Sequence, residues 1–145
     1  MKRWLGLVTA GVLAVDLGTK VWVERTLALG ERVPLVPNFL TLTRVHNVGA
    51  AFGLFPQGTA VFLAVAAATV LGLGVFLLSG RARGLYGPGA ALILSGALGN
   101  LIDRVRLGHV LDFLELPHFP VFNVADSAIV LGAFLMGLAL LRGQR

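Results

Sequence analysis

The sequence predicts an all-α membrane protein, a four-transmembrane-helix bundle with a small extracytoplasmic β element between the first and second helices. Of its 145 residues, 57% are hydrophobic and only 13% are charged, whereas soluble domains average about 25% charged residues. Long stretches of the chain carry few or no charges. The length suits one compact bundle, so we expect a single integral membrane domain over residues 1–145.

The four membrane spans are expected at about residues 4–23, 58–79, 85–102 and 123–141, because a helix needs about 20 mostly apolar residues to cross a ~30 Å hydrocarbon layer. No Asp, Glu, Lys or Arg lies between Arg44 and Arg81, and 19 uncharged residues separate Arg83 from Asp103. The last apolar run, residues 127–141, is short for a span, so its helix is expected to begin near residue 123. Asp126 then lies in its first turn.

The first predicted span contains two charged residues, Asp16 and Lys20, four positions apart. Residues at i and i+4 share a helix face, so this pair can neutralise itself and is expected to be structural. The N-terminus also resembles a signal peptide, with two basic residues before a 12-residue apolar core. We favour a helix that stays in the protein, because apolar residues resume after Asp16 and four spans give a coherent charge distribution.

The charge distribution predicts how the bundle is oriented in its membrane. Six basic residues and no acidic residue fall on one side of such a bundle: Lys2, Arg3, Arg81, Arg83, Arg142 and Arg145. The positive-inside rule makes that side cytoplasmic, with both termini there. The loops at about residues 24–57 and 103–122 then face outward. The net charge of +5 could also suggest nucleic acid, but the basic residues form no patch, so no nucleic-acid partner is expected.

The first outward loop has the pattern of a strand. Residues 38–47, NFLTLTRVHN, place Leu40, Leu42 and Arg44 on one face and alternate residues on the other, as in a half-buried strand. Pro34 and Pro37 precede the segment and restrict it to an edge or a short sheet. We therefore expect a small β element that rests on the membrane.

Two aspartates lie in apolar surroundings in the C-terminal third of the chain, Asp112 in GHVLDFLEL and Asp126 in FNVADSAIVLG. An acid at the edge of the bilayer is a candidate functional residue because its burial is costly. If the two meet there, a low dielectric and mutual repulsion keep both from ionising, so that one proton is shared. Such a pair can activate water and protonate a carbonyl oxygen, which is how paired aspartates hydrolyse peptides.

Each aspartate also has a structural interpretation. Asn123 and Asp126 have the spacing of a helix N-cap and its N3 residue, where a carboxylate favours the helix dipole. For Asp126 the capping interpretation and the catalytic interpretation have equal support from the sequence, and the two are compatible. Our hypothesis is that the helix N-terminus favours the charged form of Asp126, with Asp112 as the proton holder, but coupled titration of the pair leaves this assignment open. Without a partner, Asp112 would be a solvated loop acid beside Glu115.

A further polar group lies at the end of the third predicted span. Asn100 and Asp103 share a helix face, with Arg104 next to them. The spacing alone slightly favours a helix end at the membrane interface, with the Arg104 side chain extended toward water, over a polar cluster. His46, His109 and His118 lack the close spacing of zinc ligands, and the chain contains no cysteine, HExxH, GxSxG or phosphate-binding loop. No metal site is expected.

Four ordered segments carry a resemblance to a known family: DLGTK at 16–20, NVGAAFG at 47–53, GNLIDRVRLGHVLDF at 99–113 and FNVADSAI at 122–129. Together they span nearly the whole chain and resemble the lipoprotein signal peptidases, or signal peptidases II, which are bacterial membrane aspartic peptidases. The resemblance implies removal of the signal peptide from prolipoproteins just before a diacylglyceryl-modified cysteine. It also implies binding of cyclic peptide antibiotics, and it implies no cofactor.

The resemblance further implies roles for individual residues. Asp112 and Asp126 correspond to the catalytic pair. The residues expected to bind the substrate or shape the site are Asn47, Asn100, Arg104 and Asn123. Those expected to support the site are Asp16, Lys20 and Asp103. The β element and residues 47–53 are then expected to hold the extended peptide over the pair.

Two other classes of function are compatible with parts of the sequence. A proton-coupled membrane transporter component also uses intramembrane acids, but its acids are spread through the membrane, whereas here all seven acidic residues lie on the outer half or outside. A scaffold that binds partners through small-residue helix faces explains the glycines but not the two aspartates. The sequence therefore favours the peptidase.

Overall fold

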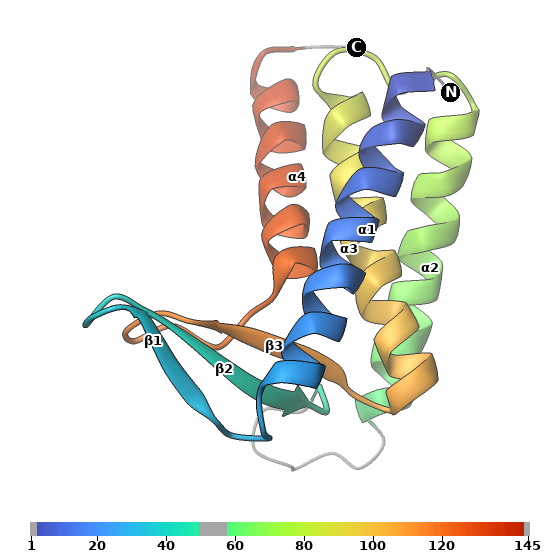
Figure 1. Cartoon of the computed structure of the whole chain (residues 1–145). Helices are drawn as coiled ribbons and strands as arrows, with labels where there is room; N and C mark the ends of the chain where they lie inside the picture. The colour runs from blue at the N-terminus through green and yellow to red at the C-terminus, as the bar shows by residue number, and fades with distance from the viewer. Residues whose placement is uncertain (1–2, 50–57, 144–145) are drawn as a thin grey trace.

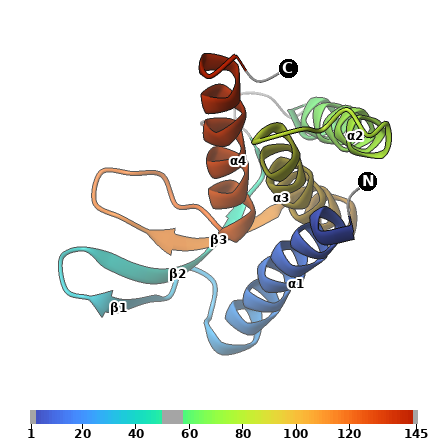
Figure 2. The same cartoon turned by 90° about the horizontal axis from the view of Figure 1, so that it is seen from above.

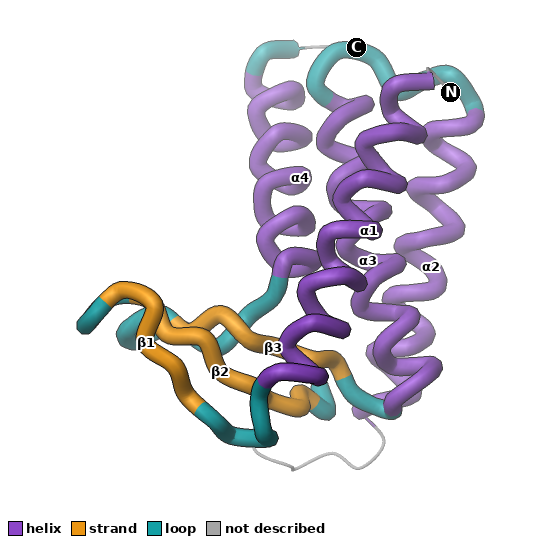
Figure 3. Tube along the Cα trace, viewed as in Figure 1, coloured by secondary structure: helices purple, strands orange, loops and turns teal. Residues whose placement is uncertain are grey.

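The computed structural model describes residues 3–49 and 58–143 and contains four helices and three strands within that part of the chain (Figure 3). The helices are α1 (Arg3–Thr26), α2 (Gly58–Leu78), α3 (Tyr86–Leu107) and α4 (Val124–Leu141). The strands are β1 (Arg32–Val36), β2 (Leu40–Asn47) and β3 (Val110–Glu115). The helices run side by side, and the sheet projects from the end of the bundle opposite to both chain termini (Figure 1).

Three helices, α1, α2 and α4, are long and apolar enough to cross a membrane. This finding supports the predicted membrane protein. Helix α3 does not meet the same criterion within the described residues, so the predicted count of four spans is not confirmed. The physical reason is its position: α3 contacts α1, α2 and α4 and lies between them (Figure 2). Its polar residues, including Ser95, Asn100 and Asp103, are buried against protein and need not be apolar.

The end of α3 differs from the prediction. The helix was expected to end at residue 102 and instead continues to Leu107, so that Asp103 and Arg104 lie in its last turns and not in an outward loop. Gly108 ends the helix with a left-handed backbone (φ 75°), and its N–H donates to the carbonyl oxygen of Arg104. Charged residues continue a helix readily, whereas a glycine in this conformation stops it.

The sheet is antiparallel in the order β1-β2-β3. Strand β2 matches the predicted strand, and Pro34 lies on the edge strand β1, where a missing N–H is tolerated. The expectation of a β element formed only between the first two helices was incomplete, because β3 comes from the segment between α3 and α4. A register shift between Leu42 and Val45 also breaks the predicted alternation.

Helices α3 and α4 approach closely because small residues face each other. A Cβ on Gly96 would collide with the carbonyl oxygen of Ala125. Small residues that allow backbones to approach are typical of helix packing in membranes. This contact brings the first turn of α4 against α3 at the level where α3 carries its polar residues.

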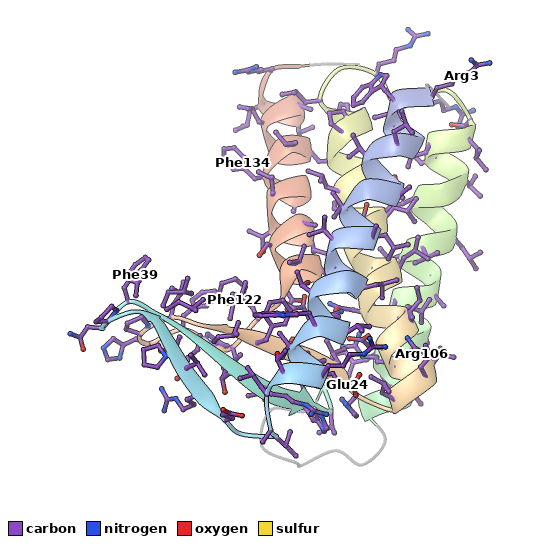
Figure 4. All side chains as sticks on the ribbon, viewed as in Figure 1. Arg3, Glu24, Phe39, Arg106, Phe122 and Phe134 are labelled. Carbon is purple, nitrogen blue, oxygen red and sulfur yellow. The ribbon has the colours of Figure 1, made fainter. Side chains whose placement is uncertain are left out.

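Within the described residues, the buried hydrophobic side chains form two clusters. One cluster lies among the helices and includes Leu5, Leu77 and Ala90. The other joins the end of α1 to the sheet through Val23, Leu42, Leu111 and Phe113. The second cluster fixes the sheet against the bundle, and Figure 4 shows Glu24 and Arg106 at this end and Arg3 at the other. The candidate site lies where the sheet meets the helices.

Candidate active site

Asp112 lies on β3 and is buried, with only 2% of its surface exposed. Strand pairing places it opposite Val45 on β2, two residues before Asn47. The Asn47 side-chain amide donates to Oδ2 of Asp112 at 2.8 Å. The Asn123 side-chain amide donates to Oδ1 at 2.8 Å. Both carboxylate oxygens are therefore held in a fixed orientation.

Burial raises the pKa of Asp112 to about 6, from an ordinary value of 3.8. The Asn47 hydrogen bond opposes this change, the negative charge of Asp126 adds to it, and the positive charge of Lys20 opposes it. Burial dominates because the charged form loses its hydration. Asp112 is thus a carboxyl group that keeps a proton to a higher pH than an exposed aspartate does.

Asp126 lies in the first turn of α4 and forms a capping box with Asn123, as the sequence predicted. The Asp126 backbone N–H donates to Oδ1 of Asn123 at 2.8 Å, and the Asn123 backbone N–H donates to Oδ2 of Asp126 at 3.2 Å. The other oxygen of Asp126 accepts a hydrogen bond of 2.8 Å from the side-chain amide of Asn100. The structural interpretation of Asp126 is confirmed, and it leaves the carboxylate half-exposed at the helix start.

Asn123 joins the two aspartates. Its side-chain amide donates to Asp112, while its backbone N–H donates to Asp126. The same side-chain amide also donates to Oδ1 of Asn100 at 3.1 Å. Asp112 on β3 and Asp126 on α4 therefore bind the same buried residue, and their charges interact. The interpretation of Asp112 as a solvated loop acid without a partner is wrong.

Asp16, Lys20 and Asp103 form a buried ionic cluster beside this pair. The ammonium nitrogen of Lys20 lies 2.8 Å from Oδ2 of Asp16 and 2.9 Å from Oδ2 of Asp103. It also donates to Oδ1 of Asn100 at 3.1 Å. The predicted pairing of Asp16 with Lys20 is confirmed. Asn100 and Asp103 belong to a polar cluster, so the preferred interpretation of a simple interfacial helix end was wrong for these two residues.

Arg104 lies in the last turns of α3 and is half-buried. Its guanidinium carbon is 5.4 Å from the centre of the Phe62 ring, and Nη1 lies 3.5 Å from the backbone oxygen of Asn100. Its charge interacts with Asp126, Asp112 and Asp103. Arg104 therefore supplies positive charge next to both candidate carboxyl groups.

The NVGAAFG segment is described only in part. Residues 50–53 lie outside the described residues, so the expected clamp over the pair stays a prediction. Within the described part, the Gly49 backbone N–H donates to Oδ1 of Asn47 at 2.8 Å. This bond turns the amide nitrogen of Asn47 toward Asp112. All nine residues predicted for the site lie in this one network or, for Arg104, in electrostatic contact with it.

Some contributors to the network were not predicted from the sequence. The backbone N–H of Leu111 donates to Oδ2 of Asp103 at 3.1 Å, and that of Ala125 donates to Oδ1 of Asp16 at 2.8 Å. Gly99 leaves room for Asp16, because a Cβ there would collide with the Asp16 carboxylate. The one feature of the sequence that points to this region is the pair of small residues Gly96 and Gly99, and such residues indicate close packing of helices.

Two histidines also meet without a sequence signal. The rings of His46 on β2 and His109 before β3 stack with their centres 3.8 Å apart. Burial lowers the pKa of His46, and the His109 ring lowers it further. The pair lies at the end of the sheet next to Asn47, where the lowered pKa favours an uncharged His46 ring.

Comparison with known proteins identifies the family. The family model described as signal peptidase (SPase) II matches residues 8–142. The chain belongs to the signal peptidase II family. The chain is 46% identical over 140 residues to the lipoprotein signal peptidase of Pelotomaculum thermopropionicum, and the alignment covers 95% of this chain and 91% of that protein. It is 41% identical over 151 residues to the lipoprotein signal peptidase of Geobacter metallireducens, and this alignment covers 99% of this chain and 93% of that protein.

The fold of this signal peptidase II family member is also found in solved structures. A structure titled as a bacterial membrane enzyme superposes with a TM-score of 0.89 at 31% identity and covers 98% of this chain and 90% of that chain. A second structure with a similar title gives a TM-score of 0.88 at 32% identity, covering 97% and 94%. Family membership makes the chain a peptidase and gives no support to the transporter alternative.

Proposed function

We propose that this protein is a membrane aspartic endopeptidase with Asp112 and Asp126 as its catalytic pair. On this proposal it removes the signal peptide from prolipoproteins just before the diacylglyceryl-modified cysteine. The observation that carries the proposal is the shared attachment of both carboxyl groups to Asn123 in a chain that belongs to the signal peptidase II family. The relatives' names support the substrate class, and the attachment of both carboxyl groups to one residue supports an acid and a base that act together.

The environments of the two carboxyl groups suggest their roles. Burial raises the pKa of Asp112 to about 6, so Asp112 keeps its proton to a higher pH than an exposed aspartate does. Asp126 lies at the N-terminus of α4 and accepts hydrogen bonds from Asn100 and from the Asn123 backbone, and we assign it the role of the base. Environments that differ in this way assign one carboxyl group as acid and the other as base.

The reaction then follows the general acid–base scheme for paired aspartates. Asp126 takes a proton from a water molecule, whose oxygen attacks the scissile carbonyl carbon, while Asp112 gives its proton to the carbonyl oxygen. The tetrahedral intermediate collapses as Asp126 gives its proton to the leaving nitrogen and a hydroxyl proton returns to Asp112. The C–N bond breaks, both aspartates regain their starting states, and no metal or organic cofactor takes part.

Substrate binding is assigned to Asn47, Asn100, Arg104 and Asn123. Asn47 and Asn123 hold Asp112, and Asn100 holds Asp126, so these amides orient the pair as well as bordering the substrate. Arg104 is the charged member of the set, and its guanidinium packs over the Phe62 ring. We assign it to the backbone carbonyl oxygens of an extended peptide, and a cyclic peptide antibiotic would occupy the same place.

The proposed placement in the membrane follows from the arrangement of charges. We assign all four helices as spans of the bacterial cytoplasmic membrane, with both termini in the cytoplasm and the aspartate pair near the outer face. The termini lie at the end of the bundle that carries Arg3, and the sheet lies at the other end (Figures 1 and 4). A lipid-bearing, helical substrate can then reach the pair laterally from the bilayer.

The test is cleavage of a diacylglyceryl-modified prolipoprotein by the detergent-solubilised protein, followed as a shift in size. The wild type should cleave, while Asp112→Asn and Asp126→Asn should remain folded and lose activity by a factor of at least about 10³. Glu115→Gln is the matched control, because Glu115 lies on the same strand but pairs with Arg32 at the surface. Cleavage by either aspartate variant at the control's rate would remove that residue from the pair.

A further inference from the structure

Lys20 occupies a central position in the buried polar network. Only 4% of its side-chain surface is exposed, and its ammonium group contacts Asp16, Asp103 and Asn100. The two carboxylates form ion pairs with the ammonium group, and Oδ1 of Asn100 accepts a hydrogen bond from it. Asp16 lies on α1, as Lys20 does, whereas Asp103 and Asn100 lie on α3.

The two carboxylates that bind Lys20 each hold the residue that precedes one of the proposed catalytic aspartates. Asp103 accepts a hydrogen bond from the backbone N–H of Leu111, immediately before Asp112. Asp16 accepts one from the backbone N–H of Ala125, immediately before Asp126. The ionic cluster therefore binds β3 and α4 at equivalent positions, one residue upstream of each carboxyl group.

The third contact of Lys20 orients a side chain that touches Asp126 directly. Oδ1 of Asn100 accepts from Lys20 and from the side chain of Asn123. Because the oxygen end of the amide faces these two donors, its nitrogen end faces Asp126, to which it donates at 2.8 Å. A flipped Asn100 would lose three hydrogen bonds, so Lys20 helps to fix the donor at the catalytic carboxylate.

Stability alone does not account for such a cluster. Burying an ammonium group and two carboxylates costs desolvation energy that their attraction repays only in part, and well-packed apolar residues often stabilise a protein as much. In contrast, a site that holds two reacting groups on different elements needs supports that lock them in position. Lys20 is linked to both elements through its partners, to β3 through Asp103 and Leu111 and to α4 through Asp16 and Ala125.

We propose that Lys20 is the positioning residue of the catalytic pair, setting Asp112 and Asp126 relative to each other through Asp103, Asp16 and Asn100. This inference rests on the proposed roles of the two aspartates. It assigns Lys20 no contact with substrate. It goes beyond a stabilising i, i+4 pair with Asp16, because the contacts with Asp103 and Asn100 connect the ammonium group to both halves of the site.

The decisive variant is Lys20→Met, assayed with a diacylglyceryl-modified prolipoprotein over a range of pH. We expect kcat to fall at least about 100-fold with KM changed less than about threefold, because a misplaced pair loses transition-state geometry. We also expect the alkaline limb of the kcat profile to move to higher pH. The charge of Lys20 lowers the pKa of Asp112, while Asp126 raises it, and Arg104 also faces the pair.

Leu77→Ala is the matched control for a purely structural effect. Leu77 is buried in the helical core cluster on α2, away from the polar network. Its truncation should lower the unfolding temperature and leave the alkaline limb unmoved. Wild-type kcat in folded Lys20→Met, or a loss without any shift of the limb as in Leu77→Ala, would overturn the proposal.

Two milder variants cover the case in which Lys20→Met does not fold. Asp16→Asn and Asp103→Asn each remove one charge and keep an oxygen that can accept the backbone hydrogen bond. We expect both to fold and to lower kcat about tenfold, and wild-type kcat in both would contradict the role of the cluster. Asp112→Asn and Asp126→Asn are assayed alongside. Activity in those two variants would refute the catalytic pair, whereas their inactivity together with a fully active Lys20→Met would refute only the role of Lys20.

Discussion

The side-chain amide of Asn123 donates a 2.8 Å hydrogen bond to Asp112 from a position that also caps the helix carrying Asp126. One asparagine thus performs two tasks that are usually separate. Its oxygen accepts from the Asp126 backbone as an N-cap, and its nitrogen donates to the carboxyl group of Asp112. The two tasks use different atoms of the amide, so substitutions can separate them.

Asn123→Ser should keep the cap and lose the donor to Asp112. A serine oxygen can accept the Asp126 N–H, so we expect Asn123→Ser to be about 1 kcal/mol more stable than Asn123→Ala. Both should be less stable than the wild type, because both lose the buried hydrogen bonds to Asp112 and Asn100. Both variants should lower kcat by about 100-fold, because neither holds Asp112. Thermal unfolding and cleavage assays measure the two effects. A serine variant with wild-type kcat would show that the bond to Asp112 is dispensable.

The cap was predictable from the sequence because its chemistry is local. Asn123 and Asp126 are three residues apart, and that spacing alone defines the capping box. The first three helix starts and the strand at residues 40–47 also followed from charge-free runs and alternation. Helix α3 was placed, but its end was not, because charged residues at 103, 104 and 106 continue a helix as well as they end one.

The meeting of the two aspartates could not be predicted from spacing. It depends on β2–β3 pairing, and β3 shows no alternation because its first four residues are all buried. It also depends on Asp16 reaching Ala125 across 109 residues of sequence. Contacts of this kind arise from tertiary packing and leave no periodic pattern. The resemblance to a family supplied the residues, and the geometry of their contacts came from the structure.

The pH dependence of activity should reflect the proton on Asp112. Burial raises the pKa of Asp112 to about 6, and the proposed mechanism needs this group protonated, so kcat should fall about tenfold per pH unit above that value. A pH series of initial rates at saturating substrate measures this limb. A rate that stays constant from pH 5 to about 8 would contradict the assignment of Asp112 as the acid.

The same carboxyl group should make stability depend on pH. The pKa of Asp112 is higher in the folded protein than its ordinary value of 3.8. The contribution of this carboxyl group to the free energy of unfolding is therefore fully present below pH 3.8 and is lost as pH rises through about 6. The unfolding temperature of the wild type should therefore contain a component that decreases across this window. Asp112→Asn should lack that component. An identical pH dependence in the two proteins would indicate that Asp112 does not titrate there.

Asn47→Ala should shift the alkaline limb upward. The Asn47 hydrogen bond lowers the pKa of Asp112, so its removal raises that pKa and keeps the proton on the carboxyl group to a higher pH. We also expect lower kcat, because one oxygen of Asp112 loses its partner. Arg32→Ala is the control, since it breaks a surface ion pair with Glu115 on the same sheet. A limb that moves equally in both variants would mean that the sheet, and not the amide, controls Asp112.

Gly99→Ala tests whether the site requires close approach of α1 and α3. The new Cβ would collide with the carboxylate of Asp16, which is fully buried and holds the Ala125 N–H. Because a buried carboxylate cannot move without losing its partners, we expect a stability loss of about 2 kcal/mol or more and a matching loss of activity. Thermal unfolding in detergent and the cleavage assay measure both.

Gly74→Ala is the matched control on α2, where a Cβ would meet no atom within 4 Å. Alanine favours a helix over glycine by up to about 1 kcal/mol, so this variant should be as stable as the wild type or more stable, with unchanged activity. If Gly99→Ala behaved like Gly74→Ala, α1 and α3 could separate at no cost. The position of Asp16 over the first turn of α4 would then not depend on a glycine at residue 99.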